Sequence, residues 1–351
     1  MPKKRIRDYG VQLDNLPTGP RNKITDVPGV AVGHATIDTP QHKTGVTVLL
    51  PRKENPFTHQ LPAASFVLNG FGKSIGLLQV EELGTLETPI ALTNTLNVGL
   101  VHDALVEYMV QRCQAENVPL TSVNPIVCEC NDSTLNNICE RAVQKEHVFS
   151  AIASAGEDFE EGAVGGGTGM VCHGLKGGIG SASRVIELPE GRFTLGVLVQ
   201  ANHGRLPDLQ IAGQPVGARI DLQNFEPDKG SIILLLATNL PASDRQLKRI
   251  IKRMSVGLAR LGSYIGHGSG EIMLGFSTAN TILRNAEHSL LTQTILNEEK
   301  IDLAFRAAAC AAEEAVLNAL VSSKTTVGYQ GDVRKSLAEF LPALHIFGGQ
   351  L

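Results

Sequence analysis

The pattern of apolar and polar residues along the chain predicts many short buried strands and a few helices. The most apolar run covers residues 232–237, six consecutive aliphatic residues that directly follow Gly230 and Ser231. Six residues are too few for a helix of ordinary length and are typical of a strand buried on both faces. Ser231 is therefore expected at the first position of a core strand, where a rigid backbone fixes the side chain and the preceding loop leaves it accessible. A Gly-Ser pair is also common in ordinary turns, so this signal alone identifies no site.

The same reasoning predicts the other elements. Short apolar or alternating runs predict strands near residues 30–36, 45–50, 65–68, 89–94, 125–128, 193–201 and 272–276. Helical spacing predicts helices over residues 98–116, over 244–261 after a capping box from Ser243 to Gln246, and over the alanine-rich segment 299–322. Residues 131–133 offer N-caps for a further helix that runs through Leu135, Ile138 and Val143. This order of elements fits a layered α/β architecture with helices outside packed sheets.

Composition narrows the class of protein. The 351 residues contain no Pro/Ser-rich linker, and we interpret residues 1–351 as one domain. A hydrophobic content of 42%, a charged content of 19% and a net charge of −4 describe a compact soluble protein with no electrostatic bias toward nucleic acid or membrane. The N-terminus has no apolar signal segment and no run approaches the ~20 apolar residues that span a bilayer, so we expect a cytoplasmic protein.

The cysteines give little support for a metal site. Six cysteines in a chain of this size do not form the disulfide framework of a small secreted domain. Cys128, Cys130 and Cys139 invite a metal hypothesis, but their spacing differs from that of zinc sites. We expect no metal and no cofactor.

The densest glycine stretch covers residues 161–170 and includes Gly166 and Gly167. It matches neither the phosphate-binding loop of nucleotide-binding proteins nor the dinucleotide fingerprint. Adjacent glycines either let the backbone approach a ligand or form a turn where no side chain fits. Both interpretations stay open from the residues alone.

Candidate catalytic residues lie where glycine-rich loops meet predicted strands. Ser269 and Glu271 share one face of a strand, so a hydroxyl and a carboxylate can together contact a nucleophile or its amine; the alternative is a turn with a surface glutamate. Asn202 ends a predicted strand, and its amide either donates to an oxyanion or only forms a turn. His203 and His267 are possible bases. If the Gly230–Ser231 bond were cut, the α-amine of Ser231, with a pKa of roughly 7.7–8.0, would be a built-in base.

Five blocks of sequence, in order along nearly the whole chain, resemble the P1 family of self-processing aminopeptidases. This is the family of the L-aminopeptidase/D-amidase-esterase DmpA and of the β-peptidyl aminopeptidases. The blocks are residues 24–36, 129–136, 161–170, 230–233 and 267–271. The resemblance implies a four-layer αββα sandwich, similar to N-terminal-nucleophile hydrolases but connected differently.

The resemblance also implies a mechanism. The chain would cut itself into a large chain, residues 1–230, and a small chain, residues 231–351, which begins with the nucleophile Ser231. Ser269 and Glu271 match the supporting serine and acid of the family, and Asn202 matches its oxyanion-hole asparagine. The family further implies a homo-oligomer, a tetramer of cleaved heterodimers.

The implied substrates are small peptides, amino acid amides or esters with a free amine. A carboxylate of the 129–132 block, Glu129 or Asp132, would anchor that amine, and Gly166 and Gly167 would lie near the substrate. In the same block the chain departs from the family, because Thr134 stands near the position where an aromatic residue is expected. This departure implies an altered preference and a reduced rate.

Two other functions remain open. An acyltransferase of the ornithine acetyltransferase type has a similar fold and cuts before a threonine, which here would be Thr238. An uncleaved, inactive binding protein is the second alternative. The stretches from Gly180 to Arg184 and from Gly268 to Gly270 lack the G-x-S-x-G spacing of a nucleophile elbow, so neither supports an ordinary serine hydrolase triad.

Overall fold

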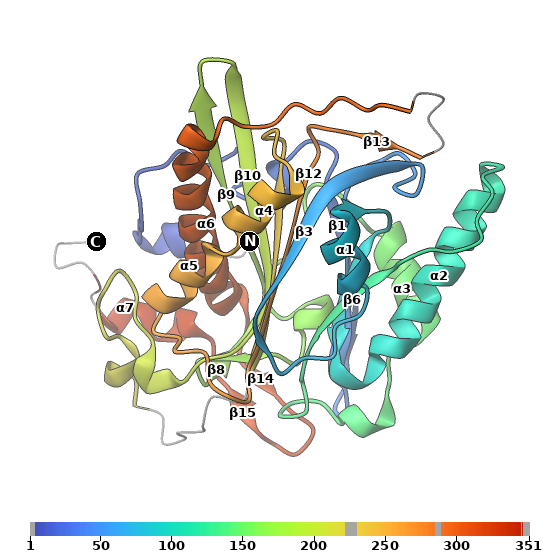
Figure 1. The fold of residues 1–351 in the computed structure, drawn as a ribbon. Helices are drawn as coiled ribbons and strands as arrows, with labels where there is room; N and C mark the ends of the chain where they lie inside the picture. Colours follow the sequence, from blue (N-terminus) through green and yellow to red (C-terminus); the bar gives the residue numbers. More distant parts are fainter. Residues whose placement is uncertain (1–3, 222–229, 285–288, 345, 347–351) are drawn as a thin grey trace.

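Two β-sheets lie face to face between two layers of helices (Figure 1). The structure is a computed structural model that describes residues 4–221, 230–284, 289–344 and 346. The four-stranded sheet has the order β1 (Ala31–Asp38), β2 (Lys43–Leu50), β5 (Ile90–Asn94) and β6 (Ile126–Cys130). The seven-stranded sheet has the order β13 (Ile282–Leu283), β3 (His59–Gly70), β12 (Gly270–Ser277), β11 (Ser231–Thr238), β10 (Gly191–Asn202) and β9 (Gly178–Leu188), with β4 (Thr85–Leu86) paired to β3.

Helices cover the outer face of each sheet. The four-stranded sheet is covered by α2 (Val98–Ala115) and α3 (Lys145–Ala153), and the seven-stranded sheet by α4 (Asp244–Ile251), α5 (Met254–Arg260) and α6 (Ile301–Ser322). The smaller elements are α1 (Leu77–Leu83), α7 (Leu341–Leu344) and the short hairpins β7 (Val171–Cys172) with β8 (Leu175–Lys176) and β14 (Thr326–Val327) with β15 (Val333–Arg334). The predicted αββα sandwich is confirmed. No helix among the described residues is long and apolar enough to cross a bilayer.

Strand β11 explains why the most apolar run lies where it does. Ile233, Leu235 and Ala237 belong to the core between the two sheets. The alternate residues Ile232, Leu234 and Leu236 belong to the core between the large sheet and its helices. Because successive side chains point to opposite faces, a strand in the second layer of four must be apolar at every position.

Small residues let α6 approach the large sheet closely. A Cβ on Gly180 of β9 would lie 2.0 Å from the carbonyl oxygen of Ala315 in α6. Gly257 of α5 is equally restricted, since a Cβ there would lie 2.6 Å from the carbonyl oxygen of Ala309. The alanine-rich sequence of α6 therefore serves packing.

The helix predicted to run from residues 131–133 through Val143 is wrong. The Asn131 side chain accepts the backbone N–H of Ser133 at 3.0 Å, and the Asp132 carbonyl accepts N–H groups from Leu135 and Asn136 at 3.1 and 2.9 Å. The side-chain bond from Asn131 competes with helix formation, and the two backbone bonds to Asp132 close a single turn. The next α-helix, α3, begins only at Lys145.

Two other predictions need correction. The helix expected over residues 244–261 is two helices, α4 and α5, although the predicted capping box at Ser243 and Gln246 is present. Strand β9 was not predicted, because its buried half is rich in glycine and serine and lacks an apolar period.

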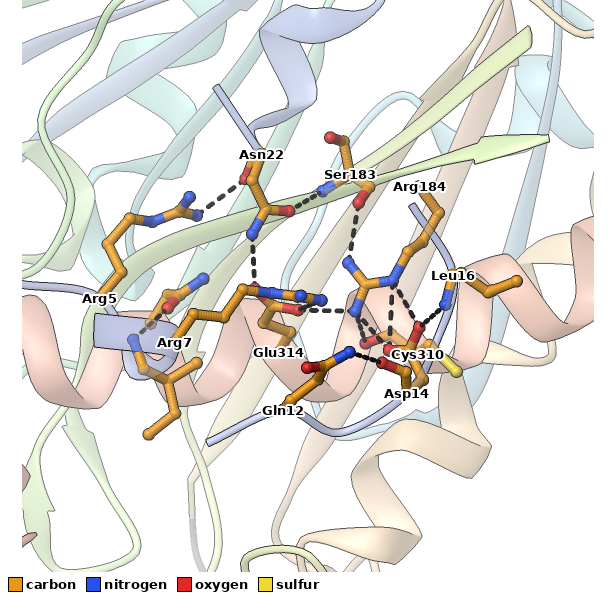
Figure 2. Close-up of polar contacts among 12 residues, drawn as sticks. Arg5, Arg7, Gln12, Asp14, Leu16, Asn22, Ser183, Arg184, Cys310 and Glu314 are labelled. Atoms are coloured by element: carbon orange, nitrogen blue, oxygen red, sulfur yellow. Dashed lines mark hydrogen bonds and ion pairs between the residues drawn. The ribbon is translucent and has the colours of Figure 1, made fainter. Parts of the chain in front are cut away.

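The buried polar side chains of β9 hold the N-terminal segment against α6 (Figure 2). Arg184 is fully buried, and its guanidinium contacts the carboxylates of Asp14 and Glu314 at 2.6 Å each. Arg7 binds Glu314 at 2.8 Å, and the amide oxygen of Asn22 accepts the N–H of Ser183 at 2.8 Å. Burial alone would raise the pKa of Glu314, but Arg7 and Arg184 outweigh it and lower that pKa below its ordinary value.

This network generates a stability prediction. Arg184→Met leaves the Asp14 and Glu314 carboxylates buried without their shared guanidinium, so we expect the free energy of unfolding to fall by about 3–5 kcal/mol. The matched control is Arg192→Met, because Arg192 pairs with Glu187 on the surface at 71% exposure and such pairs contribute about 0–1 kcal/mol. Chemical denaturation of both variants checks this, and equal losses would contradict it.

Candidate active site

Ser231 is the first residue of β11 and pairs with both neighbouring strands. It lies opposite Asn202, the last residue of β10, in an antiparallel register, and opposite Gly270, the first residue of β12, in a parallel register. Three strand ends from the middle of the sheet therefore meet at Ser231. The prediction that Ser231 begins a core strand is confirmed. Of the loop expected ahead of it, the structure describes Gly230 but not residues 222–229.

One backbone amide serves two acceptors at this point. The N–H of Gly270 donates to the carbonyl oxygen of Gly230 at 3.3 Å and to the Ser231 hydroxyl oxygen at 3.2 Å. The hydroxyl and the carbonyl that precedes it along the chain are thus held side by side at a single donor.

Neither glycine at this junction leaves space for a side chain. A Cβ on Gly230 would lie 1.8 Å from the carbonyl oxygen of Asn202, and one on Gly270 would lie 2.7 Å from the carbonyl oxygen of Phe71. Both distances are far below van der Waals contact, so the close approach of these backbones requires glycine at both positions.

A cavity of about 800 Å³ opens at the same strand ends. Among the predicted site residues, Ser231, Gly230, Asn202, Glu129 and Thr134 line it. Its volume lies within the range of roughly 300–1,000 Å³ that small-molecule sites occupy. The site is thus a pocket with Ser231 in its wall.

Ser269 and Glu271 flank Gly270 and are fully buried. The Ser269 hydroxyl donates to a carboxylate oxygen of Glu271. The structure therefore brings this predicted pair together next to the residue that Ser231 pairs with, although neither belongs to the described residues that line the cavity.

Asn202 is held from two sides. Its amide oxygen accepts the N–H of Val171 at 2.8 Å, and its amide nitrogen donates to the carbonyl of Asn131 at 2.9 Å. An amide nitrogen carries two hydrogens, so one remains for another acceptor. The side chain is consequently fixed in orientation at the cavity wall.

The two candidate carboxylates have different surroundings. Glu129 lies on β6 of the small sheet, and it accepts the N–H of Lys73 at 2.8 Å and the Thr95 hydroxyl. Asp132 is fully buried away from the cavity and accepts from the Asn136 amide at 3.0 Å. Burial raises the pKa of Asp132 to about 6, against the effect of its hydrogen bonds.

Gly166 and Gly167 lie in a short 3₁₀ turn, Gly165–Gly167, outside the described cavity lining. A Cβ on Gly166 would lie 2.3 Å from the side-chain oxygen of Gln200, and one on Gly167 would lie 2.5 Å from the backbone nitrogen of Ile179. Of the two interpretations of this stretch, the structure shows the turn where no side chain fits.

Several residues of the cavity wall were not predicted as site residues. They are the aromatic residues Phe71 and Tyr264 and the cations Lys73, Arg205 and Arg334. The glycine-punctuated stretch of residues 69–73 was a sequence signal for Phe71 and Lys73. Arg334 comes from the remote β15. The possible bases His203 and His267 also line the cavity, but burial and the neighbouring His173 lower the pKa of His203 well below its ordinary value.

The rival nucleophile Thr238 lies at the opposite end of β11. Its side chain is fully buried, donates to the carbonyl of Thr194 at 2.8 Å and accepts the N–H of Leu240 at 3.0 Å. It pairs with Leu195 and Ser277 inside the sheet and does not line the cavity. Cleavage before Thr238 would cut a central strand.

Comparisons with known proteins agree with this geometry. The model of peptidase family S58 matches residues 22–334. A β-peptidyl aminopeptidase, BapA, of Sphingosinicella xenopeptidilytica is 38% identical over 92% of this chain and 86% of its own, and that of Sphingosinicella microcystinivorans is 37% identical over 93% and 88%.

Solved structures are equally similar. A β-aminopeptidase of a Burkholderia species has a TM-score of 0.91 at 40% identity and covers 99% of this chain and 100% of its own. The L-aminopeptidase D-Ala-esterase/amidase of Ochrobactrum anthropi, described as a variant of the Ntn hydrolase fold, has a TM-score of 0.91 at 37% identity and covers 98% of both chains. The PH0078 protein of Pyrococcus horikoshii OT3 has a TM-score of 0.91 at 44% identity and covers 97% of this chain and 98% of its own. The chain therefore belongs to peptidase family S58 and is a hydrolase of the aminopeptidase type.

Proposed function

We propose that this aminopeptidase cuts its own Gly230–Ser231 bond and then uses Ser231 as an N-terminal nucleophile. Its substrates are small peptides, amino acid amides or esters with a free amine. The observation that carries the proposal is the Gly270 N–H, which holds the Ser231 hydroxyl and the Gly230 carbonyl at one donor.

The proposed self-cleavage uses this arrangement. The Ser231 hydroxyl oxygen bonds to the Gly230 carbonyl carbon, the carbon–nitrogen bond breaks, and the nitrogen gains the hydroxyl proton. During this shift negative charge develops on the Gly230 oxygen, where the Gly270 N–H already donates. Water then hydrolyses the ester, which leaves a carboxylate on Gly230 and a free amine and hydroxyl on Ser231.

The mature site uses the new amine as its base. The α-amine of Ser231 takes the proton from its own hydroxyl as the hydroxyl attacks the first acyl bond of the substrate. Ser269 and Glu271, which flank the pairing partner of Ser231, support the amine electrostatically. Asn202 offers its remaining amide hydrogen to the oxyanion, a contact worth roughly 2.7–4 kcal/mol where single donors have been removed.

Glu129 anchors the substrate amine. Of the two carboxylates in the 129–132 block, Glu129 lines the cavity, whereas Asp132 is buried outside it. The two hydrogen bonds from Lys73 and Thr95 orient the Glu129 carboxylate from the small sheet toward a cavity whose other wall carries Ser231. Ser133 and Thr134 line the cavity at the place where the family resemblance leads us to expect an aromatic residue. The altered substrate preference and reduced rate that this departure implies stay predictions.

The remaining expectations concern the assembly and its place in the cell. A homo-oligomer of cleaved heterodimers and a cytoplasmic location both stay predictions. So does the role of Gly166 and Gly167 near the substrate, for which their packing against backbone offers no support.

The first prediction from this proposal concerns the mass of the purified protein under denaturing conditions. We expect two fragments that meet at Gly230 and Ser231, because the hydroxyl is already beside the carbonyl that it attacks. Ser231→Ala should give one full-length species without activity on aminoacyl amides. A full-length wild-type species that persists on incubation would instead favour the inactive binding protein, and a cut before Thr238 the acyltransferase.

A second prediction concerns the space at the cleavage site. Gly230→Ala places a methyl group 1.8 Å from the position of the Asn202 carbonyl oxygen. We expect the carbonyl of residue 230 to lose its hydrogen bond from the Gly270 N–H, and self-cleavage to slow strongly. Gly99→Ala is the control, because a Cβ there meets nothing within 4 Å. The fraction cleaved is followed by intact mass over time; normal cleavage of Gly230→Ala would refute the proposed geometry.

A third prediction concerns the amine anchor. Glu129→Gln removes the charge that pairs with the substrate ammonium, and we expect kcat/KM to fall about 10- to 100-fold, since hydrogen bonds to charged groups contribute about 1.5–3 kcal/mol. Glu87→Gln is the control, because Glu87 is a buried carboxylate bound by Gln60 and Arg284 and does not line the cavity. Kinetics are measured only on fully cleaved protein, and an unchanged kcat/KM in Glu129→Gln would place the anchor elsewhere.

A further inference from the structure

Behind the cavity wall, three metal-ligating side chains come together from two strand ends. Cys172 ends β7, His173 follows it, and His203 follows the last residue of β10. One ligand atom from each lies within 4.8 Å of the others, and all three side chains are buried. Among the described residues, this is the one grouping of three such side chains close enough to hold an ion.

The distances fit a tetrahedral ion of the size of zinc. Zinc bonds sulfur at ≈ 2.3 Å and nitrogen at ≈ 2.0–2.1 Å, which places the two ligand atoms about 3.5 Å apart. The observed separation of Cys172 Sγ and His203 Nδ1 is 3.7 Å. The imidazole rings of His173 and His203 lie edge to face with centroids 5.3 Å apart, so both rings border the same small space.

A backbone carbonyl contacts the ring of one of the two histidines. His173 Nδ1 lies 3.1 Å from the carbonyl oxygen of Arg205, a second-shell contact of the kind that fixes which ring nitrogen faces a metal.

We propose that Cys172, His173 and His203 form an inhibitory site for Zn²⁺. A thiolate with two imidazoles is a ligand set that suits zinc, and three protein ligands leave a fourth position for water. Binding releases the thiol proton of Cys172 to solvent and involves no change of oxidation state. His203 and Arg205 also line the cavity, so the proposed site borders it.

The inhibitory effect follows from the backbone. His203 directly follows Asn202, and its carbonyl accepts the N–H of His173 at 2.7 Å. The three ligand atoms lie within 4.8 Å of one another, and tetrahedral zinc requires separations of about 3.5 Å. Binding therefore draws them together and shifts the end of β10, and with it the Asn202 that pairs with Ser231. Misplacement of a catalytic group by about 1 Å can cost roughly 100-fold in rate. Binding at this site is independent of the proposed function; the inhibition depends on it.

The test uses Co²⁺ as a spectroscopic probe and Zn²⁺ as its competitor. We expect one Co²⁺ per chain, with a thiolate charge-transfer band that Zn²⁺ removes, in both the cleaved protein and the uncleaved Ser231→Ala chain. Cys172→Ser should abolish the band, and His203→Gln should weaken the affinity roughly 100-fold or more, since even outer-shell changes cost 10–100-fold. Cys139→Ser, which alters an exposed cysteine, should leave the band unchanged.

Activity supplies the second readout. Zn²⁺ should inhibit hydrolysis of an aminoacyl amide, a chelator should reverse it, and Cys172→Ser should be resistant relative to its own metal-free rate. Absence of the band in folded wild-type protein, or its survival in both Cys172→Ser and His203→Gln, overturns the site. A normal band without inhibition overturns only the inhibitory role. A normal band in a wild-type protein that stays uncleaved and inactive would support the metal site and overturn the proposed function.

Discussion

The parallel pairing of Ser231 with Gly270 is the constraint on which the site depends. It brings a single amide to both the hydroxyl and the carbonyl of Gly230. The arrangement is rigid because β11 is buried on both faces, between the second sheet and the helices. It is also sterically demanding, since both Gly230 and Gly270 have backbone atoms where a Cβ would stand. A strand in the second of four layers thus supplies the preorganisation that the proposed self-cleavage requires.

The two-sheet construction separates attack from recognition. The groups proposed for chemistry lie on the large sheet, whereas Glu129 lies on β6 of the small sheet. Packed sheets keep a spacing of about 10 Å because side chains of both inner faces fill the space between them. The apolar residues of that layer therefore fix the distance between Glu129 and Ser231. If these residues are the amine anchor and the nucleophile, as proposed, the core sets which acyl bond reaches Ser231.

The sequence was most informative where one residue pattern had one structural solution. The run at residues 232–237 had to be a doubly buried strand, and Ser243 with Gln246 had to cap a helix. It failed where local polar bonds decide the structure, as in the turn at Asn131 and Asp132, and where burial is polar, as in β9 with its Arg184 network. The choice between Glu129 and Asp132 could not come from sequence, because only the register of β6 determines which carboxylate meets the cavity.

Adjacent residues at the end of β10 connect the catalytic site with the cluster behind it. Asn202 is held by Val171 and Asn131, while His203 contacts Cys172 and His173 on the neighbouring hairpin. The hairpin contacts two adjacent residues of β10 and its end: Val171 donates to Asn202, and Cys172, the next residue, contacts His203. A shift of the histidines on ion binding would therefore act on the Asn202 amide in two ways. One is the peptide bond between residues 202 and 203, and the other is the hydrogen bond from Val171. Close coupling of this kind needs no long pathway through the core, because the two sites share the same strand end.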